Sequence, residues 1–507
     1  MIKKILLYSF VLFIIVMTLA GCGSSETDGG NVKNNDSYTL KISSYAPDTL
    51  NPILTNNSAN ASMMNLIFEP LVYVDDSGQP VACLAQSWSY DKDSLKWHIN
   101  LRQNVRFSDS EPLTAYDVKS SLEAAMNSEP DSVYKNNLSN IEAMNAPDAL
   151  TLDIQLKTPN VNFINLLCLP ICKGNQAQKN ADFLPVGTGP YVMQSKTGEV
   201  IELVKNEDYW NKKDSNISRI QAVLLPNKNV QSFAFDTNAI DIISGNLALL
   251  SKYKGNSESN LMTISTNNLY FLGINNKKLQ DKALRQAVNM AVNKKKLCDD
   301  IVLSQYKPAE SFINSNNALY YPQLPEEVYN PEAAKLLLEN SAGSKKNLRL
   351  EILVNKDNEL KCSCADFIAM NLSDNLGITV KVKKLAFNEY KNLISSGNYQ
   401  MFIGEIEQQS DFDPSFLLGG GNMFNYSSAE MENRIAEFLS SDEATKNQAY
   451  GNIQLLYMDD MPFVSLFFET HAVVISNKIL NTGVVFRNNI FYNINQWVFS
   501  ENTDKKY

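Results

Sequence analysis

The stretch from Asn330 to Glu407 constrains the fold of this chain most strongly. Asn330 and Pro331 combine an N-cap residue with a proline in the first turn, so a helix is expected to run from there to about Asn340. The pattern then predicts strands at Leu348–Val354, Ile378–Leu385 and Tyr399–Ile406, separated by helices at Glu359–Asn375 and Asn388–Ser396. Strands that alternate with helices favour crossover connections and an α/β architecture.

A hydrophobic leader occupies residues 1–21. Lys3 and Lys4 precede an apolar run from Ile5 to Ala20, and its 16 residues fall short of the roughly 20 that a spanning helix needs. Its end, Leu19-Ala20-Gly21-Cys22, resembles the lipobox of bacterial lipoproteins, which implies lipidation of Cys22. An uncleaved membrane anchor, or an ordinary signal peptide with an incidental cysteine, is the alternative.

The segment that follows, residues 22–37, is rich in Gly, Ser, Asn and Asp, and we expect it to act as a flexible tether. The whole chain has a formal charge of −10, which becomes about −12 once the two lysines of the leader are removed. Its longest basic run is Lys294-Lys295-Lys296. This charge pattern argues against nucleic acid as a partner.

No motif for catalysis is found in the sequence. The chain contains no G-x-S-x-G, H-E-x-x-H or G-x-x-x-x-G-K-[ST] pattern. Only two histidines occur; His98 lies on the polar face of a predicted strand and His471 within another. Six cysteines besides Cys22 are too few for a disulfide framework in so long a chain, so buried or free thiols are favoured over disulfides or a metal site. We therefore expect no enzyme activity, no cofactor and no metal.

Several stretches, taken together, resemble the extracellular solute-binding proteins of family 5, which include the oligopeptide- and dipeptide-binding receptors of ABC importers. They begin with Thr49-Leu50-Asn51-Pro52 and continue at 65–72, 84–88, 97–109, 113–118, 187–191, 206–210, 273–276, 285–288 and 331–337. Among them are Gly187-Thr188-Gly189-Pro190-Tyr191 and Asn206-Glu207-Asp208-Tyr209-Trp210. The stretches follow one another in the family's order from about residue 38 onward, so the resemblance covers nearly all of the chain beyond the tether.

The resemblance implies a class II periplasmic-binding-protein fold of the α/β class, with two hinged lobes and an extra subdomain inserted in lobe I. Lobe I is then expected at 38–60, 180–267 and 470–507, the inserted subdomain at 61–179, and lobe II at 268–469. Closure of two such lobes on a ligand is a two-state motion that the ligand biases toward the closed form.

The resemblance also implies a set of ligand-binding residues. Asp411, in Ser410-Asp411-Phe412-Asp413-Pro414, matches the carboxylate that pairs with the free amine of a peptide, although a turn or cap role is the alternative. The stretch is one residue shorter than is common in the family, so Asp413 competes for that role. Phe387, Tyr270 and Asn56 fall near pocket-wall positions, with ordinary packing as the alternative for the two aromatic residues. Just upstream of Asp411, where relatives often carry a tryptophan, this chain has Glu407-Gln408-Gln409, so Gln408 is a further candidate and a more polar pocket is implied.

The leading hypothesis is a non-enzymatic receptor, lipid-anchored on the outer face of the cytoplasmic membrane and monomeric. It would capture short peptides and deliver them to the transmembrane subunits of an ABC permease. The alternatives are a family 5 receptor for a nickel chelate, haem or sugar, and a sensor of peptide pheromones.

Overall fold

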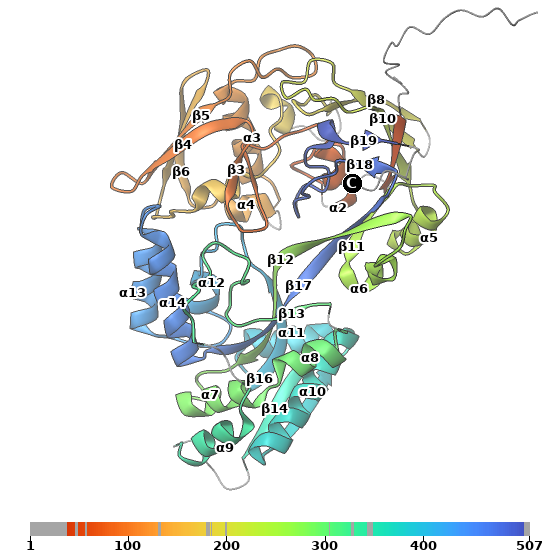
Figure 1. Cartoon of the computed structure of the whole chain (residues 1–507). Coiled ribbons are helices and arrows are strands. Elements are labelled where there is room, and N and C mark those ends of the chain that lie inside the picture. Colours follow the sequence, from red (N-terminus) through yellow and green to blue (C-terminus); the bar gives the residue numbers. More distant parts are fainter. Residues whose placement is uncertain are drawn as a thin grey trace, which may run out of the picture. The chain divides into compact units, whose positions relative to one another are not determined.

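The computed structural model describes residues 38–45, 49–55, 58–129, 133–178, 183, 185–197, 200–303, 305–325, 329–341 and 348–500 (Figure 1). The predicted leader, lipidated Cys22, tether and Asn56 therefore lie outside the described residues. Within the described residues, no helix has the length and apolar character needed to cross a membrane.

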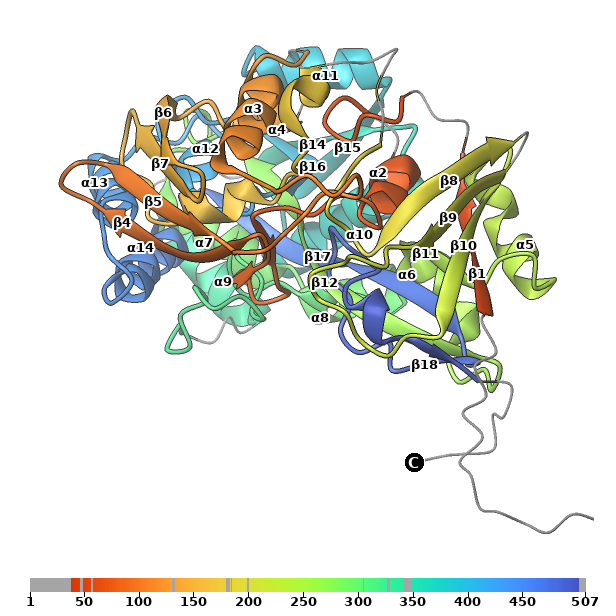
Figure 2. The ribbon, with the colours of Figure 1, turned by 90° about the horizontal axis from the view of Figure 1, so that it is seen from above.

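A large mixed sheet organises the chain, with its strands in the order β15-β14-β16-β12-β17-β11-β1-β10-β9-β8 and β13 paired to β17. Its strands are β1 (Tyr38–Ser44), β8 (Tyr191–Thr197), β9 (Val200–Lys205), β10 (Ile217–Leu224), β11 (Ile242–Asn246), β12 (Ser259–Ile274), β13 (Lys307–Pro308), β14 (Arg349–Asn355), β15 (Thr379–Leu385), β16 (Met401–Glu407) and β17 (Phe463–Ser476). Figure 2 shows β8, β9, β10 and β1 side by side at one end of this order.

The two longest strands, β12 and β17, join the two ends of the sheet and run antiparallel to each other (Figure 1). Their register shifts between Ser265 and Leu269. The irregular residues are held by Glu469, whose backbone oxygen accepts a hydrogen bond from Thr266 Oγ1 at 2.5 Å and whose Oε2 accepts one from Asn268 Nδ2 at 2.7 Å. The interruption separates the half of β12 that pairs with the β11-bound end of β17 from the half that also pairs with β16.

The predicted alternation between Asn330 and Glu407 agrees with the structure. The helices are α9 (Pro331–Glu339), α10 (Glu359–Leu376) and α11 (Phe387–Ser395), and β14 pairs in parallel with both β15 and β16. Asn330 Oδ1 accepts a hydrogen bond from the Ala333 amide at 2.9 Å, and α10 ends at Gly377 in the left-handed conformation. These caps are local signals, which explains why the pattern located the helices.

A second, four-stranded sheet lies between residues 85 and 156, in the order β4-β5-β7-β6. Its strands are β4 (Ala85–Asp91), β5 (Lys96–Leu101), β6 (Ile141–Asp148) and β7 (Thr151–Leu156), and it packs against α3 (Ala115–Met126). The remaining elements are the strands β2 (Val72–Val74), β3 (Pro80–Ala82), β18 (Ile479–Leu480) and β19 (Val498–Phe499), and the helices α2 (Ser58–Met64), α4 (Val133–Asn137), α5 (Gln231–Asp236), α6 (Leu247–Leu250), α7 (Lys282–Ala291), α8 (Lys294–Asp300), α12 (Ser415–Leu418), α13 (Ala429–Leu439) and α14 (Lys446–Asp460).

Three motifs that are distant in the sequence converge on the buried carboxylate of Glu69. Its Oε2 accepts hydrogen bonds from Thr188 Oγ1 at 2.9 Å and Trp210 Nε1 at 2.8 Å, and its Oε1 accepts one from Tyr209 at 2.8 Å. Burial is the main cause that raises the pKa of Glu69 to about 7, against the opposing effect of these donors. The stretches 65–72, 187–191 and 206–210 thus form one packed junction.

Candidate functional site

Two cavities adjoin in the structure and share one residue, Arg487, in their walls. The first cavity has a volume of about 600 Å³ and the second about 550 Å³. Both volumes fall within the roughly 300–1,000 Å³ that is usual for small-molecule sites.

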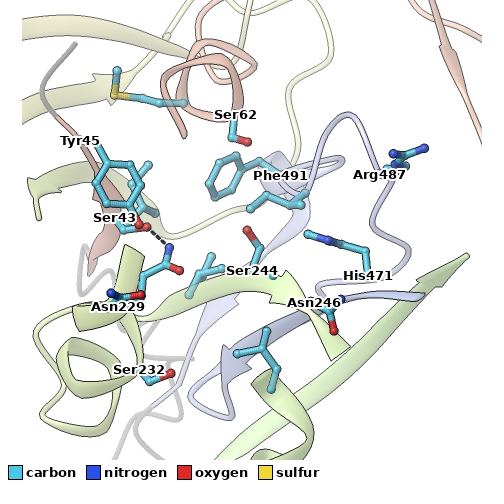
Figure 3. A pocket seen from close by; sticks show the side chains of 17 residues that line it. Ser43, Tyr45, Ser62, Asn229, Ser232, Ser244, Asn246, His471, Arg487 and Phe491 are labelled. Atoms are coloured by element: carbon cyan, nitrogen blue, oxygen red, sulfur yellow. Dashed lines mark hydrogen bonds between the residues drawn. The ribbon is translucent and has the colours of Figure 1, made fainter. Parts of the chain in front are cut away.

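The first cavity lies between β1, β11 and the C-terminal segment 487–491 (Figure 3). Polar side chains line it, with Ile42, Ile242 and Phe491 among the apolar ones; the polar set includes Ser43, Tyr45, Ser62, Asn229, Ser232, Ser244 and Asn246. Its basic side chains are Arg487 and His471, and no carboxylate occurs among its described lining residues. The interior of the first cavity is therefore neutral to positive.

Six separate stretches of the chain form the second cavity. Its described walls come from residues 74–76, 134–137, 168, 265–267, 407–410 and 487–488. Three carboxylates, those of Asp75, Asp76 and Glu407, line it together with the single guanidinium of Arg487. The second cavity is therefore negative on balance, in contrast to the first.

Arg487 is displayed on a tight turn. The backbones of Phe486 and Asn489 exchange two hydrogen bonds of 3.2 and 3.1 Å, and Asn65 Nδ2 donates to the Asn488 oxygen at 2.6 Å. The Phe486 ring stacks on Tyr492 with centroids 4.1 Å apart. These contacts hold the turn on both sides, so the backbone that carries the Arg487 side chain has a fixed position.

The guanidinium forms an ion pair across the second cavity. Arg487 Nη2 lies 2.7 Å from Glu407 Oε1, and the two side chains are 32% and 66% exposed. Figure 3 shows the guanidinium turned away from Phe491 of the first cavity. An ion pair this exposed contributes about 0–1 kcal/mol and is readily exchanged for another partner.

The two neighbouring aspartates of the second cavity differ in their bonding. Asp75 Oδ1 accepts hydrogen bonds of 2.7–2.9 Å from Ser77 and the Gln79 amide, which form the turn between β2 and β3. Asp76 has no ion-pair or hydrogen-bond partner among the described residues. The Asp76 side chain is exposed to solvent; desolvation by the surrounding turn, and secondarily the charge of Asp75, raise its pKa to about 6. A cation beside Asp76 would therefore stabilise its charged form.

Of the residues predicted to bind ligand, Gln408 lies in the wall of the second cavity. Its backbone amide donates to the Asn267 oxygen at 3.1 Å, and its Nε2 donates to the Phe312 oxygen at 2.6 Å. Gln409 and Ser410 line the same cavity, and the role of Gln408 in ligand binding stays a prediction.

Asp411 lines neither cavity. The residue is 3% exposed; its Oδ2 accepts a hydrogen bond from Asn160 Nδ2 at 2.8 Å, and Asn162 Nδ2 donates to its backbone oxygen at 3.1 Å. Burial, and secondarily the charge of Asp413, raise its pKa to about 6. The carboxylate faces the 160–162 segment, so a ligand amine would have to displace Asn160 to reach it. Its role in ligand binding stays a prediction.

The other predicted residues lie apart from the cavities. Asp413 Oδ1 accepts hydrogen bonds from the Ser415 amide at 2.8 Å and hydroxyl at 2.5 Å, just ahead of α12. Tyr270 stacks on Phe467 with centroids 4.7 Å apart in the core, whereas Phe387 is 53% exposed at the start of α11. The structure therefore brings only Gln408 of the described set to a cavity.

Among the described residues, no group of three or more His, Cys, Asp or Glu side chains is placed to hold a metal ion. Cys83, Cys168, Cys172, Cys298, Cys362 and Cys364 are free thiols. His98 contacts Asp153 at 2.6 Å on the exposed face of β5, away from both cavities.

Sequence reasoning missed Arg487 and Asp76. Arg487 stands in the asparagine-rich run Phe486-Arg487-Asn488-Asn489, where nothing in the local pattern marks it. Asp76 lies in Asp75-Asp76-Ser77-Gly78, which is typical of any turn. Both reach a cavity only through contacts with distant parts of the chain.

The chain is similar in sequence to one family of known proteins. The family description "Bacterial extracellular solute-binding proteins, family 5 Middle" matches residues 79–427. The chain is 26% identical to the nickel-binding periplasmic protein of Escherichia coli (strain K12), over 85% of this chain and 89% of the relative. It is 22% identical to the oligopeptide-binding protein OppA of Bacillus subtilis (strain 168), over 95% and 98%.

A solved structure extends the comparison. The periplasmic murein tripeptide-binding protein MppA, in its unliganded open form, superposes with a TM-score of 0.79 at 20% identity and covers 88% of this chain and 94% of its own. Together with the large mixed sheet, this similarity confirms the predicted α/β fold of the two-lobed binding proteins. The boundaries expected for the lobes and the inserted subdomain stay predictions. The chain belongs to the bacterial extracellular solute-binding proteins of family 5, a family of substrate-binding transport proteins rather than enzymes.

Proposed function

We propose that this protein captures short peptides and delivers them to an ABC permease. The observation that carries the proposal is the mixed charge around Arg487, with carboxylates on one side and a basic, polar cavity on the other. A peptide with free termini carries one charge of each sign, and these opposite charges match that arrangement. The oligopeptide-binding and murein tripeptide-binding relatives support the same ligand class.

The proposal includes a location. We infer that Cys22 carries lipid and that residues 22–37 tether a monomeric receptor to the outer face of the cytoplasmic membrane, close to the permease. The leader and the lipobox-like Leu19-Ala20-Gly21-Cys22 support this inference. Mass spectrometry of the membrane-extracted protein tests it, since Cys22→Ser should remove the lipid mass and release the protein from the membrane.

A metal chelate is the second candidate ligand. One relative is named a nickel-binding periplasmic protein, and His471 together with Arg487 would suit an anionic chelate in the first cavity. Against it, chelate binding would leave the carboxylates of the second cavity without a cation.

Thermal shift measurements separate these candidates, because a ligand that binds the folded state raises the melting temperature. A library of di- to hexapeptides is compared with nickel–histidine, haem and sugars. A rise with peptides supports the proposal. If no peptide raises the melting temperature and nickel–histidine does, peptide capture is wrong.

A further inference from the structure

The two cavities carry opposite net charge, and this difference constrains which ligands fit them. The first cavity has Arg487 and His471 and no carboxylate among its described lining residues. The second has Asp75, Asp76 and Glu407 against the same Arg487. A dipolar ligand that spans both is therefore oriented, with its anionic end toward the first cavity and its cationic end in the second.

Arg487 is the group most suited to hold the anionic end. It is the one guanidinium in either described wall, and its turn is pinned by Asn65 and by the Phe486 ring. Its present partner, Glu407, is 66% exposed, so a ligand carboxylate can replace Glu407 without stripping a buried charge of its partner. A carboxylate and a guanidinium also fit each other in a bidentate geometry.

The exchange changes the charge balance of the second cavity. Once a ligand carboxylate occupies Arg487, Glu407 loses its cation, and Asp76 has none among the described residues at the start. Asp75 is partly stabilised by the amides of its own turn. Two carboxylates then face the cavity without a cation from the described residues, and a peptide of neutral residues offers them only its terminal ammonium.

We propose that this receptor prefers short peptides with a basic residue at the amino end, whose carboxylate binds Arg487 and whose two cationic groups pair with Glu407 and Asp76. This inference rests on the proposed function, because it names a subclass of peptides for the same site. It assigns the ligand amine to Asp76 and Glu407 rather than to Asp411, whose carboxylate is already bonded to Asn160. The raised pKa of Asp76 agrees with an acidic group that gains from a cation.

Isothermal titration calorimetry on the full-length protein in detergent tests the proposal with Lys-Ala-Ala, Ala-Ala-Ala and Glu-Ala-Ala. Each ion pair is expected to change affinity by on the order of threefold to tenfold, so the lysine peptide should bind tightest and the glutamate peptide weakest. Asp76→Asn should remove most of the preference for lysine over alanine. Arg487→Gln should weaken free-acid peptides and should not weaken their C-terminal amides, because it removes the carboxylate partner and frees Glu407 for the ligand cation.

Matched controls keep the result specific. Asp374→Asn removes an exposed carboxylate from α10 and Arg349→Gln an exposed guanidinium from β14, and both should bind all three peptides as the wild type does. Circular dichroism on each variant verifies folding.

The possible outcomes distinguish a failure of peptide capture from a failure of the proposed preference for a basic residue. Absence of binding by all three peptides, with a response to another solute class, overturns peptide capture itself. Peptide binding without a charge preference, or with a preference that Asp76→Asn leaves intact, overturns only the present inference. The same holds if Asp411→Asn, and not Asp76→Asn, abolishes the preference.

Discussion

Replacing Asp411 with asparagine should stabilise this protein at neutral pH. The residue is 3% exposed, and burial, with a smaller contribution from Asp413, raises its pKa from 3.8 to about 6. One pKa unit corresponds to about 1.4 kcal/mol, so the ionised carboxylate lowers the free energy of unfolding by about 3 kcal/mol relative to the protonated form.

The sign of the pH dependence follows from the raised pKa. Below about pH 4 the carboxyl is protonated in both the folded and the unfolded state, so it imposes no penalty. Between about pH 4 and 6 the unfolded chain ionises while the folded protein stays protonated, so the stability present in acid is lost progressively and is gone above about pH 6. Asparagine does not titrate, and its Oδ1 can keep the hydrogen bond that Asn160 donates. Asp411→Asn should therefore be about 2–3 kcal/mol more stable than the wild type at pH 7.5 and nearly equal at pH 4.

Urea denaturation followed by tryptophan fluorescence between pH 4 and 8 measures this difference. Asp374→Asn, which removes an exposed carboxylate on α10, serves as the control and should change stability by less than about 0.5 kcal/mol at every pH. If Asp411→Asn is less stable than the wild type at pH 7.5, the charged form is favoured in the fold and the reasoning from burial is wrong.

Three further substitutions test the packing that supports the site. Glu69→Ala leaves the buried hydroxyl of Thr188 and the half-buried donors of Tyr209 and Trp210 without their acceptor, so it should lower the free energy of unfolding by about 3 kcal/mol in urea titrations. Arg285→Leu removes hydrogen bonds to four backbone oxygens, two of them at the end of α14, and should lower the free energy of unfolding by about 3 kcal/mol in guanidinium chloride denaturation. Arg349→Leu, on the exposed surface, is the control and should change the free energy of unfolding little. Gly187→Ala would press a Cβ atom into the backbone oxygen of Ile67 and should lower the calorimetric melting temperature through a loss of about 1–3 kcal/mol; an unchanged melting temperature would mean that this junction is loose.

Local chemistry explains which parts of the fold were predictable. Helix α9 follows from the cap at Asn330 and the proline that comes after it, and α10 from the strand–helix alternation around it; the structure adds Gly377 as the local signal that ends α10. The family resemblance extended the prediction to the whole fold. One of its stretches contains Gly187, and the structure shows why a glycine is needed there, because the backbone of Ile67 approaches it closely. The sequence alone thus determined the α/β class, the family, and the expectation of a solute-binding receptor.

The composition of the candidate site depended on the tertiary structure. Gln408 lines the second cavity, but its role in ligand binding stays a prediction. Asp411, from the same stretch, faces away from the cavities, because Asn160, 251 positions away along the chain, donates a hydrogen bond to its carboxylate. Arg487 entered the site through a turn held by Asn65, which lies 423 positions earlier. A periodic pattern reports which face of an element is buried, whereas the partner that covers this face is decided by long-range strand pairing and side-chain contacts. For that reason the sequence determined what kind of protein this is, and only the tertiary structure decided which charges face its ligand.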